Sequence, residues 1–265
     1  MQSLPPRHAD IVALARSAGR VEVEPLAQQL GVTPQTIRKD LKELCERGLL
    51  QRYHGGATIA SGVANVGYEA RRQLATDAKR RIGRRAAALI PDNASLLINI
   101  GTTTEQVAHA LRHRSGLMVI TNNINVAHIL QASTGIEVVV AGGVLRHADG
   151  GIVGEAAVDF IRQFRVDYAI VGVSAVDTDG SLLDFDYREV RVAKAIVEAS
   201  RRVILVVDSM KFGRSAPVRI GHLSQLDHLV TDERPPESIV RILREHHVGL
   251  EVVDTDDAQF AEKAA

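Results

Sequence analysis

The sequence predicts an α/β chain with a small N-terminal winged helix-turn-helix domain and a larger C-terminal domain built on a mostly parallel sheet. Two observations predict it. The first 60 residues hold two short helical patterns and a glycine hairpin, and most of the remaining chain alternates Val- and Ile-rich runs with helical periodicity. With 265 residues, the chain is long enough for about two domains.

The first domain is predicted from two helices joined by a tight turn. Pro25–Leu30 forms the first helix, and Gly31 supplies the turn. Thr33 can cap the second helix, whose first position is Pro34, where a missing N–H costs nothing. The apolar residues of that helix recur on one face: Ile37, Leu41 and Leu44. The opposite face is therefore exposed and basic.

The second helix of a helix-turn-helix enters the major groove of duplex DNA with its N-terminal residues toward the base edges. The candidates for base contact are Thr33, Gln35, Thr36 and Arg38. Lys39 and Lys42 lie further along and suit phosphates, which set affinity but not sequence choice. A solvated amphipathic helix would show the same pattern, so this helix alone leaves both interpretations open.

A predicted hairpin favours the DNA-binding interpretation. Gly55 and Gly56 predict the turn of a two-stranded wing, and the flanking Arg52 and His54 are further candidates for DNA contact.

Charge is distributed unevenly along the chain. Residues 1–90 contain 15 Lys and Arg against 8 Asp and Glu, whereas residues 91–265 contain 17 against 24. Such a basic excess is expected where a segment faces phosphates. Part of it follows the wing, and we interpret that part as a solvated linker and helix face rather than as direct DNA contact: Arg71, Arg72, Lys79, Arg80, Arg81, Arg84 and Arg85.

Cysteine content and hydropathy limit the metal sites, disulfides and membrane segments that the chain can have. Cys45 is the only cysteine, which excludes an intrachain disulfide and a Cys-rich zinc site. The chain opens without the apolar core of a signal peptide, and no run approaches the roughly 18 apolar residues of a membrane span. We therefore expect a cytoplasmic protein without a metal or cofactor.

The domain boundaries are predicted from small residues and from the start of the next helix. Ser61–Gly67 is small and flexible, so we expect a first domain at 1–60, a linker at 61–75 and a second domain at 76–265. A helix is expected from Thr76 to Leu89, ended by Pro91.

Seven short apolar runs in the second domain are of the kind buried on both faces of a sheet. They are 96–100, 117–120, 136–140, 168–171, 203–207, 229–230 and 250–253. Helical patterns lie between them, at 105–111, 125–130, 158–164, 189–198 and 237–244. This alternation predicts crossover helices and a mostly parallel sheet.

Ligands of open α/β sheets bind at the carboxyl ends of the strands, where three polar loops are predicted. These loops contain Gly101, Thr102 and Thr103; Thr121, Asn122 and Asn123; and Gly142 and Gly143. Backbone amides near helix N-termini suit a phosphate ester. No G-x-G-x-x-G or G-x-x-x-x-G-K-[ST] motif follows the first run, which disfavours dinucleotides and nucleoside triphosphates. Ordinary caps and turns are the alternative interpretation.

Charged residues accompany these loops. Asp208 and Lys211 follow the fifth run, and Lys211 could pair with a phosphate, although an exposed loop lysine is the alternative. Asp186 and Glu189 could accept hydrogen bonds from sugar or polyol hydroxyls, and a solvated helix start explains them equally well.

Several motifs together resemble the DeoR family of bacterial transcriptional repressors. They are Pro34–Leu41, Arg52–Ala57, Ile100–Thr103, Val119–Asn123, Ala141–Gly143 and Val207–Gly213. Longer stretches resemble a subgroup of the family whose inducer is glycerol 3-phosphate: 122–127, 149–156 and 179–191. The resemblance spans nearly the whole chain.

The resemblance implies a sensor domain similar in fold to ribose-5-phosphate isomerase and glucosamine-6-phosphate deaminase. It implies a phosphorylated sugar or polyol as inducer, with glycerol 3-phosphate favoured. At matching positions the phosphate would lie against Gly101, Thr102, Thr103 and the 121–123 loop, with Lys211 nearby and Asp186 or Glu189 toward the hydroxyl end. Asn99 departs from the pattern, which has Asp at that position.

The resulting hypothesis is a repressor that holds double-stranded operator DNA as a symmetric homo-oligomer and is released by its inducer. Two alternatives stay open. One is the same repressor with a different sugar-phosphate inducer. The other is a sugar-phosphate isomerase with Glu189 or Asp186 as general base, against which the DNA-binding domain argues.

Overall fold

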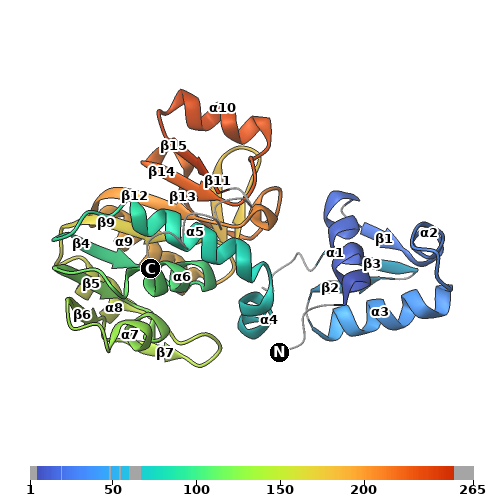
Figure 1. Cartoon of the computed structure of the whole chain (residues 1–265), viewed down its shortest axis with the longest axis horizontal. Helices are drawn as coiled ribbons and strands as arrows, with labels where there is room; N and C mark the ends of the chain where they lie inside the picture. Colours follow the sequence, from blue (N-terminus) through green and yellow to red (C-terminus); the bar gives the residue numbers. More distant parts are fainter. Residues whose placement is uncertain (1–4, 19, 48, 54, 60–66, 254–265) are drawn as a thin grey trace, which may run out of the picture. The chain divides into compact units, whose positions relative to one another are not determined.

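The computed structural model describes residues 5–18, 20–47, 49–53, 55–59 and 67–253 (Figure 1). The chain divides into two compact units, between Leu74 and Ala75. His54 and residues 61–66 of the expected linker 61–75 lie outside the described residues. The division into 1–60, 61–75 and 76–265 stays a prediction. Among the described residues, no helix has both the length and the apolar character needed to cross a membrane.

The first unit contains the predicted helix-turn-helix. Its elements are α1 (Pro6–Ala18), β1 (Arg20–Glu22), α2 (Val23–Gln29), α3 (Pro34–Glu46), β2 (Leu50–Tyr53), β3 (Gly56–Ile59) and α4 (Tyr68–Gln73). The predicted wing is the antiparallel pair β2–β3, and β1 pairs with the other side of β3. Helix α1, which the sequence analysis did not anticipate, contributes the buried residues Ile11, Val12 and Ala15.

The turn between α2 and α3 depends on Gly31, whose φ of +65° lies in the left-handed region that favours glycine. Past this turn, α3 packs the three residues that the pattern predicted, because Ile37, Leu41 and Leu44 are each 0% exposed. Both predicted helices are therefore confirmed, although α2 begins earlier than expected, at Val23.

The second unit is built on a parallel sheet in which, among the described residues, seven strands follow the order β15-β14-β12-β9-β4-β5-β6. All seven predicted runs are strands of this sheet: β4 (Ser95–Ile98), β5 (Leu117–Thr121), β6 (Ile136–Val140), β9 (Val166–Val171), β12 (Ser200–Val206), β14 (His228–Thr231) and β15 (Gly249–Val252). Strands that follow one another along the chain are mostly neighbours in this sheet, and the exception is the central pair of β4 and β9.

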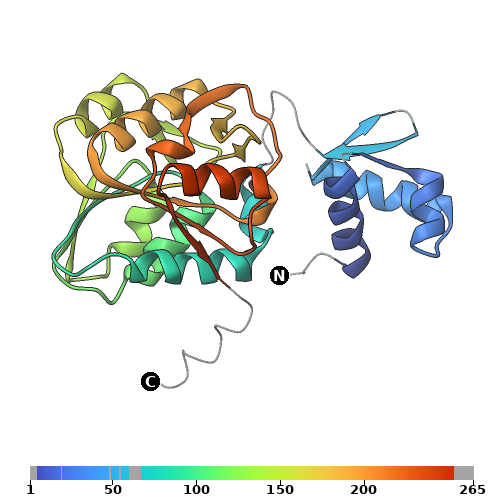
Figure 2. The ribbon, with the colours of Figure 1, turned by 90° about the horizontal axis from the view of Figure 1, so that it is seen from above.

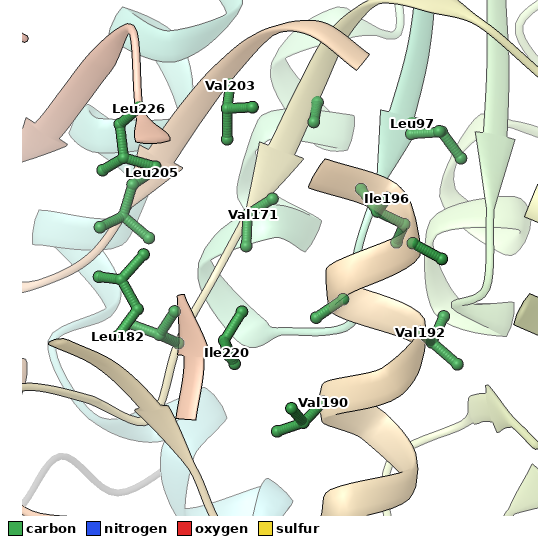
Figure 3. Close-up of a cluster of buried hydrophobic side chains, with 14 of the residues drawn as sticks. Leu97, Val171, Leu182, Val190, Val192, Ile196, Val203, Leu205, Ile220 and Leu226 are labelled. Carbon is green, nitrogen blue, oxygen red and sulfur yellow. The ribbon is translucent and has the colours of Figure 1, made fainter. Parts of the chain in front are cut away.

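Helices cover both faces of this sheet, as the two views show (Figures 1 and 2). They are α5 (Thr76–Ala88), α6 (Thr102–Leu111), α7 (Ile124–Leu130), α8 (Glu155–Ile161), α9 (Tyr187–Glu198) and α10 (Glu237–Glu245). Helices α5, α6 and α7 pack on one face, in a cluster that includes Leu96 and Ile98. The other face carries Leu97 against α8 and α9 (Figure 3). Successive β4 residues thus enter opposite cores, as expected of a strand buried on both faces.

Shorter elements follow directly from strand ends of the main sheet. The hairpin β7 (Val144–Arg146) and β8 (Gly151–Val153) follows β6, and the helical turn η1 (Ser209–Lys211) follows β12. An antiparallel sheet of β10 (Ala175–Val176), β11 (Ser181–Asp184) and β13 (Val218–His222), with η2 (Leu223–Gln225), begins just after β9. These elements were not predicted, and they place extra side chains at the carboxyl edge of the parallel sheet.

Candidate functional site

The start of α3 has the geometry that the sequence predicted. The Thr33 hydroxyl accepts a hydrogen bond from the Thr36 backbone N–H at 3.2 Å, and Pro34 occupies the first turn. The hydroxyls of Thr33 and Thr36 are also 2.9 Å apart and hydrogen-bonded. Because both hydroxyls serve the cap, Gln35 and Arg38, which are exposed, are the less encumbered candidates for base contact.

The basic face of α3 is open to solvent. Lys39 and Lys42 are exposed, as is Arg52 on β2, whereas His54 lies outside the described residues. Arg38 makes an ion pair with Glu24 of α2 at 3.1 Å, with both side chains about half exposed or more. Such an exposed pair is weak, so the guanidinium can exchange Glu24 for a base or a phosphate at low cost.

A buried carboxylate anchors α3 to α1. Asp40 accepts from Arg7 Nε at 2.6 Å and lies 3.1 Å from His8 Nε2, and its side chain is 6% exposed. Burial acts to raise the pKa of Asp40, but the hydrogen bonds with Arg7 and His8 outweigh burial and lower it. The sequence analysis did not single out this contact, which fixes the helix that presents the basic face.

In the second unit, the ends of β4 and β5 are joined side by side. The Thr121 hydroxyl donates to the Ile98 carbonyl at 2.7 Å and accepts from the Asn123 backbone N–H at 3.0 Å. Gly101 is the N-cap of α6, and Thr102 and Thr103 are buried in its first turn. The structure therefore brings two of the three predicted loops together, at one helix N-terminus.

A buried glutamate, missed by the sequence analysis, holds these loops in place. Glu105 of α6 accepts from Asn123 Nδ2 at 3.2 Å and from Asn125 Nδ2 at 3.0 Å. Asn123 also caps α7 by accepting from the Asn125 backbone N–H at 2.9 Å. Asn123 is thus engaged on both amide atoms, so its role is to shape the loop.

The third predicted loop leads into the β7–β8 hairpin. Gly142 and Gly143 are exposed, and a Cβ on Gly143 would lie 2.9 Å from the Val153 carbonyl oxygen, so the close approach requires glycine. The hairpin is tied to the end of β5 by Asn122, whose backbone carbonyl accepts from the Ile152 N–H at 2.7 Å. The loop therefore shapes the hairpin as well as lining the sheet edge.

Arg146 of this hairpin gathers three carboxylates. Its guanidinium lies 2.7 Å from Asp149, 2.9 Å from Asp186 and 2.6 Å from Glu189. Asp186 is the N-cap of α9, and Glu189 lies in the first turn of that helix. The two acidic residues predicted to face ligand hydroxyls are thus already bonded to an arginine that the sequence analysis did not single out.

Two of these carboxylates share the guanidinium with opposite effects on their pKa values, because the pKa of Asp186 falls and that of Glu189 rises. Burial acts to raise the pKa of Asp186, but hydrogen bonds from Arg188 and Arg146 outweigh it and lower that pKa to about 2. Burial, with the nearby Asp184 carboxylate, raises the pKa of Glu189 to about 7, although Arg146 opposes the shift. Glu189 is therefore the carboxyl of this cluster that changes charge near neutral pH.

The end of β12 holds a second buried ionic group. Asp208 is 0% exposed, and within the described part of the chain neither of its carboxylate oxygens has a hydrogen-bond partner. Its cationic neighbour is Lys79 of α5, with Nζ 4.0 Å from Oδ2. Lys79 is 3% exposed, so the prediction that it lies on a solvated helix face is wrong. Lys211, expected at this site, is also buried, at 8% exposed.

All the predicted effector residues lie at the carboxyl edge of the parallel sheet or on the elements that follow it. Direct hydrogen bonds join the β4 and β5 ends, and ion pairs join the hairpin to α9, while β9 separates β12 from β4 in the sheet. Within the residues described, no group of three or more His, Cys, Asp or Glu side chains is placed to hold a metal ion.

Two family models match the chain. One, described as the DeoR-like helix-turn-helix domain, matches residues 7–63. The other, described as the DeoR C terminal sensor domain, matches residues 74–233.

Curated relatives match along almost their whole length. The chain is 49% identical over 246 residues to the glycerol-3-phosphate regulon repressor of Escherichia coli (strain K12), covering 93% of this chain and 98% of that protein. It is 48% identical to the repressor of the same name from Haemophilus influenzae, covering 92% and 95%. The HTH-type transcriptional repressor CsqR of Escherichia coli is 40% identical, with 96% and 97% covered.

Solved structures match at lower similarity. A D-ribose-5-phosphate isomerase in complex with phospho-erythronic acid is 16% identical, with a TM-score of 0.40 and 52% of this chain and 54% of that chain covered. The translation initiation factor eIF-2B of Pyrococcus horikoshii OT3 is 17% identical, with a TM-score of 0.46 and 85% and 95% covered.

Proposed function

The chain belongs to the DeoR family, and on this premise we propose that it is a transcriptional repressor that binds operator DNA and is released by a phosphorylated polyol or sugar. The observation that carries the proposal is one chain with both family domains and 49% identity, over 93% of its length, to a glycerol-3-phosphate regulon repressor. The repressor would act on DNA in the cytoplasm.

The proposed DNA contact is the basic face of α3. Gln35 and Arg38 would contact base edges, while Lys39, Lys42 and Arg52 would contact phosphates. Thr33 and Thr36 would hold the start of the helix in register through their cap. On binding, Arg38 would leave the Glu24 carboxylate and contact DNA instead. The released Glu24 carboxylate would then repel phosphates that approach in the wrong position.

Glycerol 3-phosphate is the proposed inducer, because the relatives that are 49% and 48% identical to this chain bear its name. The phosphate would lie at the N-terminus of α6, against the amides of Gly101, Thr102 and Thr103, beside the 121–123 loop. The buried cations Lys211 and Lys79 would supply positive charge from β12 and α5.

Release of DNA requires two states of a homo-oligomer. One state would hold two DNA-binding units at the spacing of a near-palindromic operator, and the other would not. An inducer releases DNA only if it binds the second state more tightly, and by linkage the operator must weaken inducer binding by the same factor.

Titration calorimetry of the full chain with glycerol 3-phosphate, with and without operator DNA, tests this proposal. We expect the inducer to bind more weakly, by about 5- to 150-fold, when operator is present. Lys211→Ala should lose inducer binding and keep operator binding, whereas Lys194→Ala, an exposed position of α9, should leave both unchanged. Equal inducer affinities in the two titrations would contradict the mechanism.

The alternative function is that of a sugar-phosphate isomerase, whose active site would lie at the same carboxyl edge of the parallel sheet, with Glu189 or Asp186 as general base. Both carboxylates are bonded to Arg146, which holds them away from the role of a free base. Incubation with pentose and hexose phosphates tests this alternative. Turnover by the natural chain that is abolished in Glu189→Gln would support the enzyme. If the natural chain shows no turnover, the result supports the repressor.

A further inference from the structure

Two buried asparagines lie next to each other where β4 and β5 end. The last residues paired between these parallel strands are Ile98 and Thr121, which are also joined by the hydrogen bond from the Thr121 hydroxyl to the Ile98 carbonyl at 2.7 Å. Asn99 and Asn122 directly follow that pair, and each is 0% exposed. Neighbouring strands lie about 4.8 Å apart, so the two asparagines leave the sheet at the same level, on adjacent strands.

Each amide has one atom engaged and one atom without a partner. Asn99 Oδ1 accepts from the Ile100 backbone N–H at 2.7 Å, while its Nδ2 has no hydrogen-bond partner among the described residues. Asn122 Nδ2 donates to the Ile152 carbonyl at 3.1 Å, while its Oδ1 has none within the same residues. The engaged atoms fix both amide orientations, because a flip would face a donor with a donor or an acceptor with an acceptor.

The two unengaged atoms are thus a donor on Asn99 and an acceptor on Asn122. Buried polar atoms are rarely left unpaired, because their desolvation is costly. A hydroxyl group satisfies both at once, since its oxygen accepts from Asn99 Nδ2 while its hydrogen is donated to Asn122 Oδ1. A phosphate oxygen would face the Asn122 carbonyl oxygen as a second acceptor, so a phosphate does not fit this pair.

We propose that Asn99 and Asn122 together bind a hydroxyl group of the effector, and so select a phosphorylated polyol or sugar that carries a hydroxyl next to its phosphate-bearing end. This inference rests on the proposed function. It replaces Asp186 and Glu189, which are bonded to Arg146, as the recognition point for hydroxyls. It also gives Asn99 a role that the aspartate expected at this position cannot perform, because a carboxylate lacks the N–H donor.

The test measures binding of four probes by titration calorimetry to the full chain: glycerol 3-phosphate, 2-hydroxypropyl phosphate, 3-hydroxypropyl phosphate and inorganic phosphate. Each organic analogue lacks one hydroxyl of glycerol 3-phosphate. We expect 3-hydroxypropyl phosphate, which lacks the hydroxyl next to the phosphate-bearing end, to bind about 10- to 100-fold more weakly than glycerol 3-phosphate, the penalty for leaving buried polar atoms unpaired. The other analogue, 2-hydroxypropyl phosphate, keeps that hydroxyl and should keep most of the affinity.

The decisive variant is Asn99→Asp, which keeps the shape and the acceptor for Ile100, removes the donor and adds a negative charge. The ratio of the two affinities, glycerol 3-phosphate against the weaker analogue, should fall to below about threefold, because the hydroxyl then loses half of its pairing. The ratio cancels any uniform effect of the new charge on phosphate binding. Asn122→Ser is a second variant with the same expectation, and Asn93→Asp, at an exposed turn before β4, is the matched control that should keep the ratio.

Three outcomes overturn the inference in different ways. If the natural chain binds both analogues as tightly as glycerol 3-phosphate, no hydroxyl is recognised, and the proposed repressor function is untouched. If discrimination exists but is unchanged in Asn99→Asp and Asn122→Ser, the hydroxyl is bound elsewhere and an internal water fills the gap between these amides. If the chain binds none of the phosphorylated compounds, the proposed function fails together with this inference.

Discussion

The two units bury their carboxylates in opposite ways. In the first, one carboxylate, Asp40, lies between two basic side chains, Arg7 and His8. In the second, one guanidinium, that of Arg146, is shared by three carboxylates, and Asp208 faces Lys79 across 4.0 Å. A carboxylate between two basic side chains stabilises one arrangement of the helices that carry them. A cluster with more carboxylates than cations depends on its single cation, and its net charge changes when one carboxylate is protonated. Such a cluster suits a part of the molecule that switches between two conformations.

This difference follows from where the groups lie. Asp40 is on the packed side of α3 and joins two helices, whereas Arg146 comes from a hairpin laid across the end of a sheet. Elements added at the carboxyl edge of a parallel sheet must meet the polar ends of several strands and helices at once. We therefore expect substitutions in the second cluster to have larger and more pH-dependent effects than those in the first.

The largest expected effect is that of Arg146→Leu. Removing the shared cation leaves Asp149, Asp186 and Glu189 facing one another, and should lower the free energy of unfolding of the second unit by about 3–5 kcal/mol. Denaturant unfolding of the full chain, with hydrogen exchange to assign the unit, measures it. Arg188→Leu is the control, because this arginine is half exposed and, in the described part of the chain, its ion pair is with Asp186 at the surface, which is worth less than about 1 kcal/mol. Similar small losses in both variants would remove the contrast between the units.

An intermediate effect is expected from pH. The pKa of Glu189 is raised in the folded state to about 7, so the folded chain binds this proton more tightly than the unfolded chain. The associated stability is present at low pH and is lost as pH rises toward and through about 7. Between pH 5 and 8 the natural chain should lose about 2 kcal/mol of stability in the second unit, at about 1.4 kcal/mol for each unit of pKa shift.

Glu189→Gln should remove this loss, since glutamine does not titrate, and the stability of the second unit should become flat between pH 5 and 8. In the first unit, Asp40 should make stability change with pH in the opposite direction. Its pKa is lowered in the folded state, so the stability it contributes is lost only when pH falls below the ordinary pKa of an aspartate. A pH-dependent loss that persists in Glu189→Gln would assign the titration to a different group.

The smallest expected effect is that of Asp40→Asn. The amide oxygen still accepts a hydrogen bond, but the attraction to Arg7 and His8 is lost, so the first unit should lose about 1 kcal/mol. Amide exchange should accelerate in α1 and α3 and stay unchanged in the second unit. Glu24→Gln, at an exposed position on α2, is the control with no expected change in stability. A loss as large as that of Arg146→Leu would show that the first unit is equally dependent on one ionic group.

Much of the fold was predictable because its signals are local. Thr33, Pro34 and Gly31 mark the helix-turn-helix through cap and turn geometry, and the seven apolar runs mark the strands of the sheet. Helix boundaries were less exact: α8 begins at Glu155, before the apolar residues from which it was predicted. Strands β7, β8 and β10 have only two or three residues, too few to show a periodicity of their own, whereas β13 was missed because Arg219 and His222 interrupt its apolar residues.

The site was only partly predictable because its key contacts join distant residues. Lys79 resembles its exposed neighbours Arg80 and Arg84 in sequence, and only the packing of α5 against Asp208 distinguishes it. Arg146 could have been noticed, since Asp149 follows at i+3, but its bonds to Asp186 and Glu189 span 40 and 43 residues. The roles of the predicted DNA and effector residues stay predictions until the titrations above are made.

The strand order has a consequence for synthesis on the ribosome. The last strand of the first unit ends at Ile59, with partners no farther away than Arg20, whereas β4 in the middle of the large sheet must wait for β9, which begins at Val166. Local contacts form fast and distant ones slowly. During translation the N-terminal unit can therefore fold while the strands of the large sheet are still being synthesised.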